Sequence, residues 1–182
     1  LDSIAAARQC IYIENQYLSA HRIGKALEAR LADADGPEVV IVLPRETGGW
    51  LERHTMDVLR GRVLRRLRKS DRHDRLRIYY PRIADEPDCT VMVHAKVMLI
   101  DDDFARVGSS NLSNRSMGLD SECDLAIAAG DNRDVRAAIV RFGNRLIAEH
   151  CGSEVAEVAD AVARTGSLIK AIESLSTGER RL

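Results

Sequence analysis

The chain has 182 residues, of which 45% are hydrophobic and 30% are charged. This length and composition fit one folded domain, or one lobe of a larger enzyme, and exclude a disordered chain. The formal net charge of −1 gives no global sign of a nucleic-acid-binding protein. No apolar run approaches the roughly 18 residues that would indicate a membrane-spanning helix.

The first part of the chain alternates between predicted strands and helices. Residues 10–18 and 75–81 are rich in β-branched and aromatic residues, which is typical of strands. Residues 38–44 form a continuous apolar run, which is typical of a strand buried on both faces. An amphipathic helix is expected over residues 21–34.

A long basic helix is expected over residues 51–70, after a glycine-rich loop at 45–50. Leu59, Val63 and Leu67 would form its apolar stripe. The cations of its other face are Arg60, Arg62, Arg65, Arg66, Arg68, Lys69 and Arg72. This face either attracts anionic lipid headgroups or is simply solvated, and the sequence leaves both interpretations open.

The second part begins with a polar connection at residues 82–90. Two strands joined by a tight turn at residues 101–103 follow, and a third strand is expected at 121–129. The remaining residues, 131–149 and about 153–175, are predicted to be helical. Strands alternating with helices predict an α/β fold, in which a mixed β-sheet is flanked by helices.

The cysteines give no sign of a metal site or a disulfide framework. Cys10, Cys89, Cys123 and Cys151 are widely spaced and form no CxxC pair. We therefore expect free thiols, a reducing compartment, and neither a metal nor another cofactor.

The chain opens at Leu1 in a helix-like segment, with no Met and no signal peptide. We expect it to be part of a longer protein that is cytoplasmic or peripheral to the membrane. Within it, we expect a catalytic domain over residues 1–150 and a helical extension over 151–182.

His94 and Lys96 stand out in the apolar segment at residues 91–100. Side chains alternate between the faces of a strand, so these two would project on the same side. A Lys in an apolar strand is costly to bury unless an anion pairs with it. A phosphate group would be a suitable anion.

Polar residues follow this pair at the end of the next predicted strand. Gly108 would let the backbone approach a ligand, and Ser109 and Asn111 add groups that could hold phosphoryl oxygens. Glu122 opens the third strand, and its carboxylate could bond to the far ring nitrogen of His94 and so fix the tautomer. An exposed strand-end acid is the alternative interpretation of Glu122.

The pattern formed by His94, Lys96, Asp101, Gly108, Ser109 and Asn111 resembles the signature of the phospholipase D superfamily. The match continues through residues 114–117 and 120–122. Residues 11–18 look like the segment that opens the second half of phospholipases D with two such motifs. The resemblance covers about residues 3–150, and no internal repeat supplies a second motif.

The resemblance implies a mechanism and residue roles. In the family, one motif His forms a phospho-histidine intermediate, and the other protonates the leaving alcohol and then activates water or an acceptor alcohol. By position, His94 would be the acid/base, although the nucleophilic role stays open. Lys96, Ser109 and Asn111 would contact phosphate, and Glu122 would orient His94. Asp101 matches the motif Asp, which we group with the catalytic set although its turn position favours a structural role.

In-line displacement at phosphorus requires groups on both sides of the phosphorus atom, so one imidazole cannot do both jobs. The other histidines are His21, His54, His73 and His150, and none has a Lys two residues later. We expect the second His to come from a missing N-terminal lobe or from a second copy of the chain.

Three further residues are candidates for the cleft. Asn15 and Gln16 end the first strand beside the expected site, and Trp50 lies where the glycine-rich loop meets the basic helix. The resemblance allows Asn15 or Gln16 to touch the headgroup or support the cleft. Trp50 would line the entrance or cap a core.

The sequence thus predicts the C-terminal catalytic half of a phospholipase D that hydrolyses or transfers phosphatidyl groups. Its partners would be a phospholipid substrate and the membrane surface, and no nucleic acid is expected. Two alternatives are another phosphodiesterase of the superfamily, such as a cardiolipin synthase or a dimeric nuclease, and a non-catalytic phosphate-binding lobe.

Overall fold

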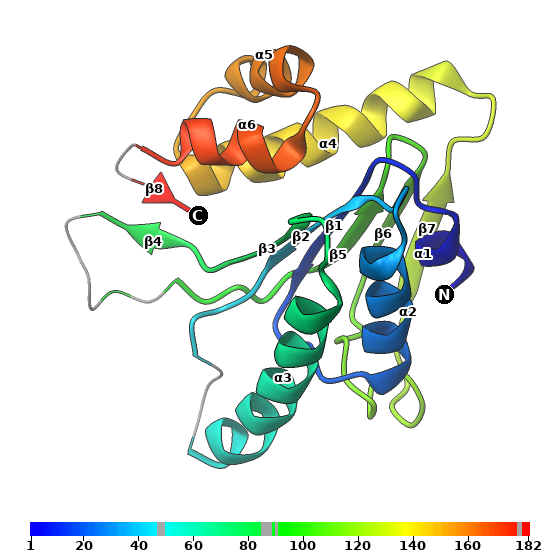
Figure 1. Ribbon diagram of the computed structural model, residues 1–182, viewed down its shortest axis with the longest axis vertical. Coiled ribbons are helices and arrows are strands. Elements are labelled where there is room, and N and C mark those ends of the chain that lie inside the picture. The colour runs from blue at the N-terminus through cyan, green and yellow to red at the C-terminus, as the bar shows by residue number, and fades with distance from the viewer. Residues whose placement is uncertain (47–49, 85–88, 90, 178–179) are drawn as a thin grey trace.

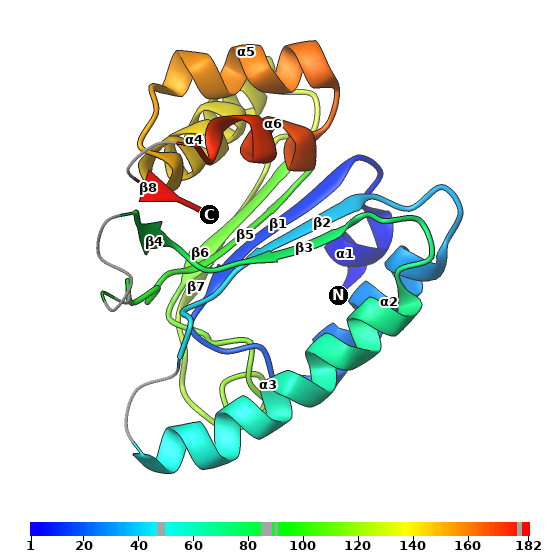
Figure 2. The ribbon, with the colours of Figure 1, turned by 60° about the vertical axis from the view of Figure 1, so that its left-hand side comes forward.

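The computed structural model describes residues 1–182 except 47–49, 85–88, 90 and 178–179, and it leaves the side chains of 50–55 undescribed. The glycine-rich loop and the side chains of Trp50 and His54 therefore lie outside the described part. A central sheet separates two helical layers (Figures 1 and 2). The predicted α/β fold with a mixed sheet flanked by helices is confirmed.

The central sheet has six strands in the order β3-β2-β1-β5-β6-β7. β1, β2 and β3 are parallel to one another, whereas β5 pairs antiparallel with β1, and β6 and β7 continue in antiparallel fashion. The strands span Cys10–Asn15 (β1), Glu38–Val42 (β2), Leu76–Tyr79 (β3), Lys96–Ile100 (β5), Phe104–Gly108 (β6) and Asp124–Ala128 (β7). A second, two-stranded sheet pairs Arg82–Ile83 (β4) with Arg180–Arg181 (β8).

Six helices cover the two faces of the large sheet in the described chain. One layer contains Asp2–Ala6 (α1), His21–Ala32 (α2) and Trp50–Ser70 (α3). The other contains Arg133–Cys151 (α4), Val155–Thr165 (α5) and Leu168–Leu175 (α6). None of the described helices combines the length and apolarity needed to cross a membrane.

Side-chain alternation divides the core into two clusters, one on each face of the sheet. In β1, Ile11 and Ile13 face the layer of α1 to α3, and Tyr12 faces the layer of α4 to α6. Both faces of β2 are buried, as its unbroken apolar sequence predicts: Val39 joins the first cluster and Val40 the second.

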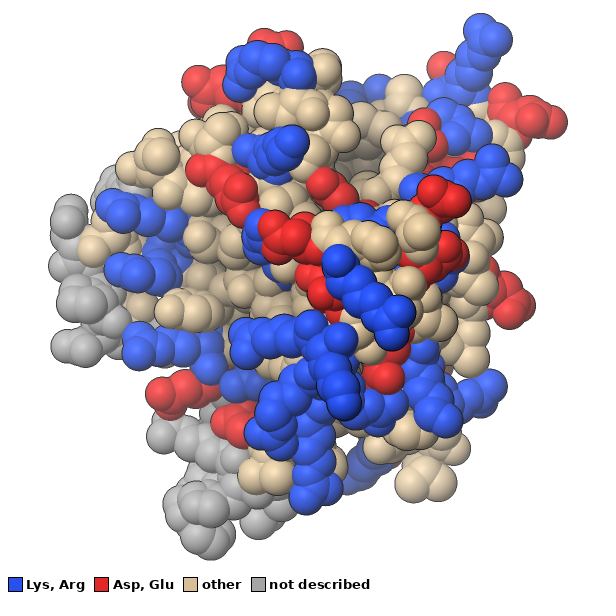
Figure 3. Space-filling view, viewed as in Figure 1, with Lys and Arg blue, Asp and Glu red and all other residues tan. Residues whose placement is uncertain are grey.

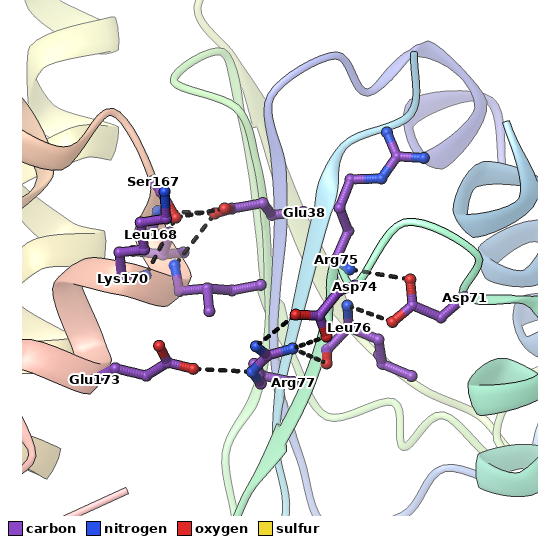
Figure 4. A network of polar contacts seen from close by, with 11 residues as sticks. Glu38, Asp71, Asp74, Arg75, Leu76, Arg77, Ser167, Leu168, Lys170 and Glu173 are labelled. Atoms are coloured by element: carbon purple, nitrogen blue, oxygen red, sulfur yellow. Dashed lines mark hydrogen bonds and ion pairs between the residues drawn. The ribbon is translucent and has the colours of Figure 1, made fainter. Parts of the chain in front are cut away.

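Polar contacts attach the C-terminal helices to the sheet (Figure 4). The carboxylate of Glu38 accepts hydrogen bonds from the hydroxyl of Ser167 and from the backbone N–H of Leu168, at the N-terminus of α6. A carboxylate is favourable there because the helix dipole is positive at that end. Arg77 of β3 pairs with Glu173 of α6 at 2.9 Å and with Asp74 at 2.8 Å.

Two predicted strands are shorter than expected. β5 begins only at Lys96, so residues 91–95 are not part of the sheet. The reason is that its partner β1 ends at Asn15, which pairs with Lys96, so residues 91–95 have no β1 partner. β7 begins at Asp124, so Glu122 precedes the strand instead of opening it.

Two helix predictions also need correction. Residues 153–175 form two helices, α5 and α6, separated at Gly166, whose φ of 62° ends α5 in the left-handed conformation. Val63 and Leu67 of α3 are buried as predicted, but Leu59 is 37% exposed. Gly24, near the start of α2, packs against Val63, so α3 extends beyond the start of α2 and leaves Leu59 uncovered.

Gly108 is required because a carboxylate occupies the space that a side chain would need. A Cβ at Gly108 would lie 2.0 Å from Oδ1 of Asp124 and 2.6 Å from the Asp124 Cα. Asp124 in turn pairs with Arg106 at 2.8 Å and accepts a hydrogen bond from the hydroxyl of Ser110. Gly108 thus makes room for a carboxylate of its own protein, not for a ligand as we expected.

We predict that Gly108→Ala lowers the free energy of unfolding by about 2–4 kcal/mol, because a backbone-level clash must be relieved. Urea denaturation measures this change. The control is Gly61→Ala within α3, where a Cβ has no neighbour closer than 4.0 Å. That substitution should stabilise the chain by about 0.5–1 kcal/mol, as is usual inside a helix. Equal effects of the two substitutions would contradict this packing argument.

Candidate active site

Lys96 is a buried cation at the first position of β5. The residue is only 9% exposed, and its Nζ donates a hydrogen bond to the backbone carbonyl of His94 at 2.9 Å. Desolvation lowers the pKa of Lys96, and the nearby Glu122 acts in the opposite direction. An ammonium group has three donors, and this carbonyl is the one acceptor assigned to it among the described residues.

His94 is exposed and lies two residues before β5. The expectation that strand alternation places His94 and Lys96 on one face is therefore wrong, because His94 is outside the strand. The two residues are connected instead through the His94 carbonyl. The His94 ring has no hydrogen bond to any other described residue, so the imidazole is free to act on a ligand.

Glu122 contacts Ser109 and not His94. Oε2 of Glu122 accepts a hydrogen bond from the Ser109 hydroxyl at 2.6 Å. Backbone pairing explains this, because the Ser109 N–H donates to the Cys123 carbonyl at 3.0 Å and brings the two side chains together. The predicted hydrogen bond from His94 to Glu122 is not present in the described contacts, which is a correction to the expected orienting role.

Asn111 carries an unsatisfied polar atom. Its Oδ1 is buried and has no hydrogen-bond partner in the described structure. Buried polar atoms without partners are uncommon, because each costs the desolvation of the group. Such an atom next to Ser109 and Ser110 indicates a place where a ligand hydrogen bond, or a rotated amide, would be favourable.

Asn15 holds the loop that carries Ser109 and Asn111. Its buried Oδ1 accepts hydrogen bonds from the backbone N–H groups of Tyr17 and Leu112, both at 3.1 Å. Asn15 therefore supports the cleft rather than contacting a substrate. Gln16 is half-buried and forms no hydrogen bond with the described residues around it.

Asp101 lies at the opposite end of β5 from Lys96, roughly 16 Å away along the strand. Its carboxylate accepts hydrogen bonds from the backbone N–H groups of Arg8, Gln9 and Cys10, at 3.0, 2.8 and 2.9 Å. These contacts fix the entry into β1. They support the structural interpretation of Asp101, and its grouping with the catalytic residues stays a prediction.

Neither His150 nor His21 has a described contact that places it beside Lys96. His150, at the end of α4, contacts Oε1 of the buried Glu14 at 3.1 Å, and Tyr12 donates to the same oxygen at 2.5 Å. Tyr12 belongs to the core cluster on the α4 face, whereas Lys96 has the strand parity of Met98, which faces α2. His21 starts α2, where Asn114 caps its backbone N–H at 2.9 Å.

Ser110, Asn114 and Asp124 were not predicted as site residues. These residues fix the loop between β6 and β7: Ser110 bonds to Asp124, and Asn114 caps α2. Their polar types in a Ser/Asn-rich loop were the available signal. An open pocket of about 670 Å³ adjoins this loop, and Glu122, Ser110 and Asp124 are among the residues that line it. His94 and Lys96 lie outside its described lining.

Three groups are candidates for holding an anion. Lys96 supplies a positive charge, Ser109 a hydroxyl and His94 a free imidazole. In the described part of the chain, no group of three or more His, Cys, Asp or Glu side chains is arranged to hold a metal ion.

Comparison with known proteins agrees with this geometry. Residues 1–143 match the family described as "Cardiolipin synthase, PLD-like domain". Phospholipase D alpha 1 of Carica papaya is 24% identical over 84% of this chain, and the chain spans 27% of the length of that relative. The chain belongs to the phospholipase D superfamily.

Three solved structures share the fold. NucT from Helicobacter pylori has a TM-score of 0.54 at 18% identity, over 80% of this chain and 83% of its own. Nuc from Salmonella typhimurium, a phospholipase D family member, has a TM-score of 0.52 at 20% identity, over 78% and 79%. Phosphatidylserine synthase of Haemophilus influenzae has a TM-score of 0.60 at 18% identity, over 93% of this chain but 43% of its own.

We predict that Asn15→Ala lowers the free energy of unfolding by about 1–3 kcal/mol, because it leaves the buried Leu112 N–H without an acceptor. Chemical denaturation measures the loss, and hydrogen exchange at the Leu112 amide should accelerate. Gln16→Ala is the matched control, with an expected change within about 0.5 kcal/mol. If the Leu112 amide stayed as protected in Asn15→Ala as in the wild type, Asn15 would not be the support of this loop.

The lowered pKa of Lys96 predicts a pH dependence of stability. Between the native pKa and the ordinary value of 10.5, the unfolded state binds more protons than the native state, so this group makes stability rise with pH. Urea unfolding of Lys96→Met, from about pH 7 to 10.5, should lack this contribution. Lys170→Met, at an exposed position of α6, should retain it. Identical pH profiles for the two variants would argue against a perturbed Lys96.

Proposed function

We propose that this chain is one catalytic half of a phosphodiesterase that acts on phospholipids, by phosphatidyl hydrolysis or transfer. The observation that carries the proposal is the buried Lys96, whose ammonium has one assigned acceptor, the neutral backbone carbonyl of His94. A bound phosphate would supply the counter-charge that this carbonyl lacks. Asn111 can contact the same phosphate only through its Nδ2 donor, with the amide rotated from the orientation that leaves its Oδ1 without a partner.

The proposed reaction has two steps. A histidine nitrogen attacks phosphorus, the bond to the leaving alcohol breaks, and an acid protonates that alcohol. Water or a second alcohol, deprotonated by the same group, then attacks the phospho-histidine and releases the enzyme. His94 takes one of these roles, as acid/base or as nucleophile. Lys96 and the Ser109 hydroxyl stabilise the charge on the phosphoryl oxygens, with Asn111 as the third contact.

The second histidine would come from another lobe. The described residues place no second imidazole beside Lys96, and in-line displacement needs a group on each side of phosphorus. The lobe could belong to the same polypeptide, as suggested by the fact that this chain spans 43% of the phosphatidylserine synthase, or to a second copy, as suggested by the Nuc proteins of similar length.

An apolar surface near Ser109 is uncovered, on the face of the sheet that α4 packs against. Val107 and Leu125 are cross-strand partners at the ends of β6 and β7 next to Ser109, and Leu125 is 65% exposed. Ile127 is also exposed, and all five residues of β7 are open to solvent. Edge strands of this kind are usually covered in the working form of a protein.

The phospholipid class rests on the family and on one relative. The family description names cardiolipin synthase, and the papaya relative is a phospholipase D. Both names denote proteins that act on phosphodiesters of lipids. In this proposal, the headgroup takes part as the alcohol that leaves the phosphodiester or as the alcohol that accepts the phosphatidyl group.

The test that does not require the second lobe is phosphate binding. Inorganic phosphate should shift the imidazole signals of His94 in ¹H–¹⁵N spectra at neutral pH. Lys96→Met should weaken this binding by at least tenfold, or about 1.4 kcal/mol, because the charged partner is lost. Lys170→Met should bind phosphate like the wild type. Binding that survives Lys96→Met unchanged would remove the phosphate site.

Turnover then tests the two-lobe requirement. The chain alone, monomeric by light scattering, should hydrolyse a short-chain phosphatidylcholine and a bis-aryl phosphodiester at close to the uncatalysed rate. Robust turnover by such a monomer would refute the requirement for a second histidine. In the protein with its second lobe, His94→Ala should abolish turnover.

A further inference from the structure

The outer face of α3 carries cations that the fold itself does not neutralise. Arg60 pairs with Asp57 at 3.0 Å, and Arg66 pairs with Glu28 at 2.8 Å. The remaining cations are exposed and form no hydrogen bond or ion pair with another described residue; they are Arg62, Arg65, Arg68, Lys69 and Arg72. Because the whole chain has a net charge of −1, these five residues form a local positive patch on an otherwise balanced protein.

Helical periodicity concentrates this charge on one line. Arg62, Arg65 and Lys69 follow one another at intervals of three and four residues, and so lie on the same side of the helix. The buried Val63 and Leu67 lie on the opposite side and pack in the first core cluster. Figure 3 shows Lys and Arg side chains gathered over the region of α3, with fewer acidic side chains between them.

The same helix presents exposed apolar side chains closer to its N-terminus. Val58 lies four residues before Arg62 on the same line and is 49% exposed, and Leu59 beside it is 37% exposed. Val63 is 13 residues into α3 but packs against Gly24, which is three residues into α2, so α3 extends about ten residues, or roughly 15 Å, beyond the start of α2. A projecting helix that carries the exposed apolar side chains of Val58 and Leu59 before a cationic stretch fits an interfacial helix.

The projecting end of α3 lies at the active-site end of the molecule. α3 follows β2, whose last residue Val42 pairs with Glu14, and the next residue of β1 is Asn15. The loops after β6 and the start of α3 lie at the same end of the fold in both ribbon views (Figures 1 and 2). A flat surface that lies along α3 would therefore reach the active-site end of the molecule at the start of the helix.

We propose that the outer face of α3, formed by Val58, Arg62, Arg65 and Lys69, is together with Arg72 just beyond the helix end a docking surface for anionic lipid membranes. Membranes rather than nucleic acid are favoured because Val58 and Leu59 give the face an apolar part, which a phosphate backbone does not use but a lipid interface does. This surface is separate from the residues of the proposed catalytic site, and its test does not depend on turnover.

The experiment is co-sedimentation of the chain with vesicles. One set consists of phosphatidylcholine alone, and the other contains about one third phosphatidylglycerol, at about 50 mM salt. The wild type should bind the anionic vesicles and not the neutral ones, and about 500 mM salt should release it. A wild type that ignores anionic vesicles at low salt would overturn the proposal.

The test variant combines Arg62→Gln, Arg65→Gln, Lys69→Gln and Arg72→Gln. Each cation near an anionic surface strengthens binding by about fivefold, so the variant should bind more than about 100-fold more weakly. The control combines Arg133→Gln, Arg141→Gln, Arg145→Gln and Arg164→Gln, which removes four exposed cations of the other helical layer. It should bind within about twofold of the wild type, because these cations are off the docking face.

Each other outcome contradicts the proposal. Undiminished binding by the α3 variant places the contact elsewhere, and equal losses in both variants indicate a response to net charge alone. If the wild type binds a short DNA duplex but no vesicle, and the α3 variant does not, the surface is for nucleic acid. Phosphate binding at His94 and Lys96 in the same variants separates these results from the catalytic proposal, because it should be unchanged in both.

Discussion

The buried charge of Lys96 is the constraint on which the rest of the site depends. An ammonium group at the end of a β-strand, 9% exposed and in contact with a carbonyl oxygen, is stable only where the surrounding fold holds it firmly. The fold does so through the register of β1 and β5, in which Asn15 lies opposite Lys96. Asn15 then fixes the loop that brings Ser109 and Asn111 to the same place.

Hydrogen bonds of polar side chains, together with the pairing of β6 and β7, shape the loop around this charge. Ser109 and Glu122 meet because the chain pairs across β6 and β7, and Gly108 leaves space for Asp124. His94, in contrast, is held only through its own carbonyl. The groups proposed to bind an anion are thus held by the fold, whereas the His94 imidazole has no hydrogen-bond partner among the described residues.

Much of the fold could be predicted from the sequence because it depends on local periodicity. The apolar run of β2 and the helical periodicity of α2 predicted the right elements, and the family resemblance named the candidate site residues. The first residue of β5 could not be predicted, because it is set by where β1 ends, and this depends on a contact between distant segments. The same holds for Glu122: sequence spacing suggested His94 as its partner, but the pairing of Ser109 with Cys123 decides which donor it meets.

The packing of α5 and α6 determines where this chain can be truncated. The family match ends at residue 143, yet Val158, Ile169 and Ile172 beyond that point are buried against Tyr12 and Val40 in the same core cluster. The folding unit is therefore longer than the segment that resembles other proteins. A truncation at the end of the match would remove half of α4 with all of α5 and α6, and would expose to water much of the sheet face to which Tyr12 and Val40 belong.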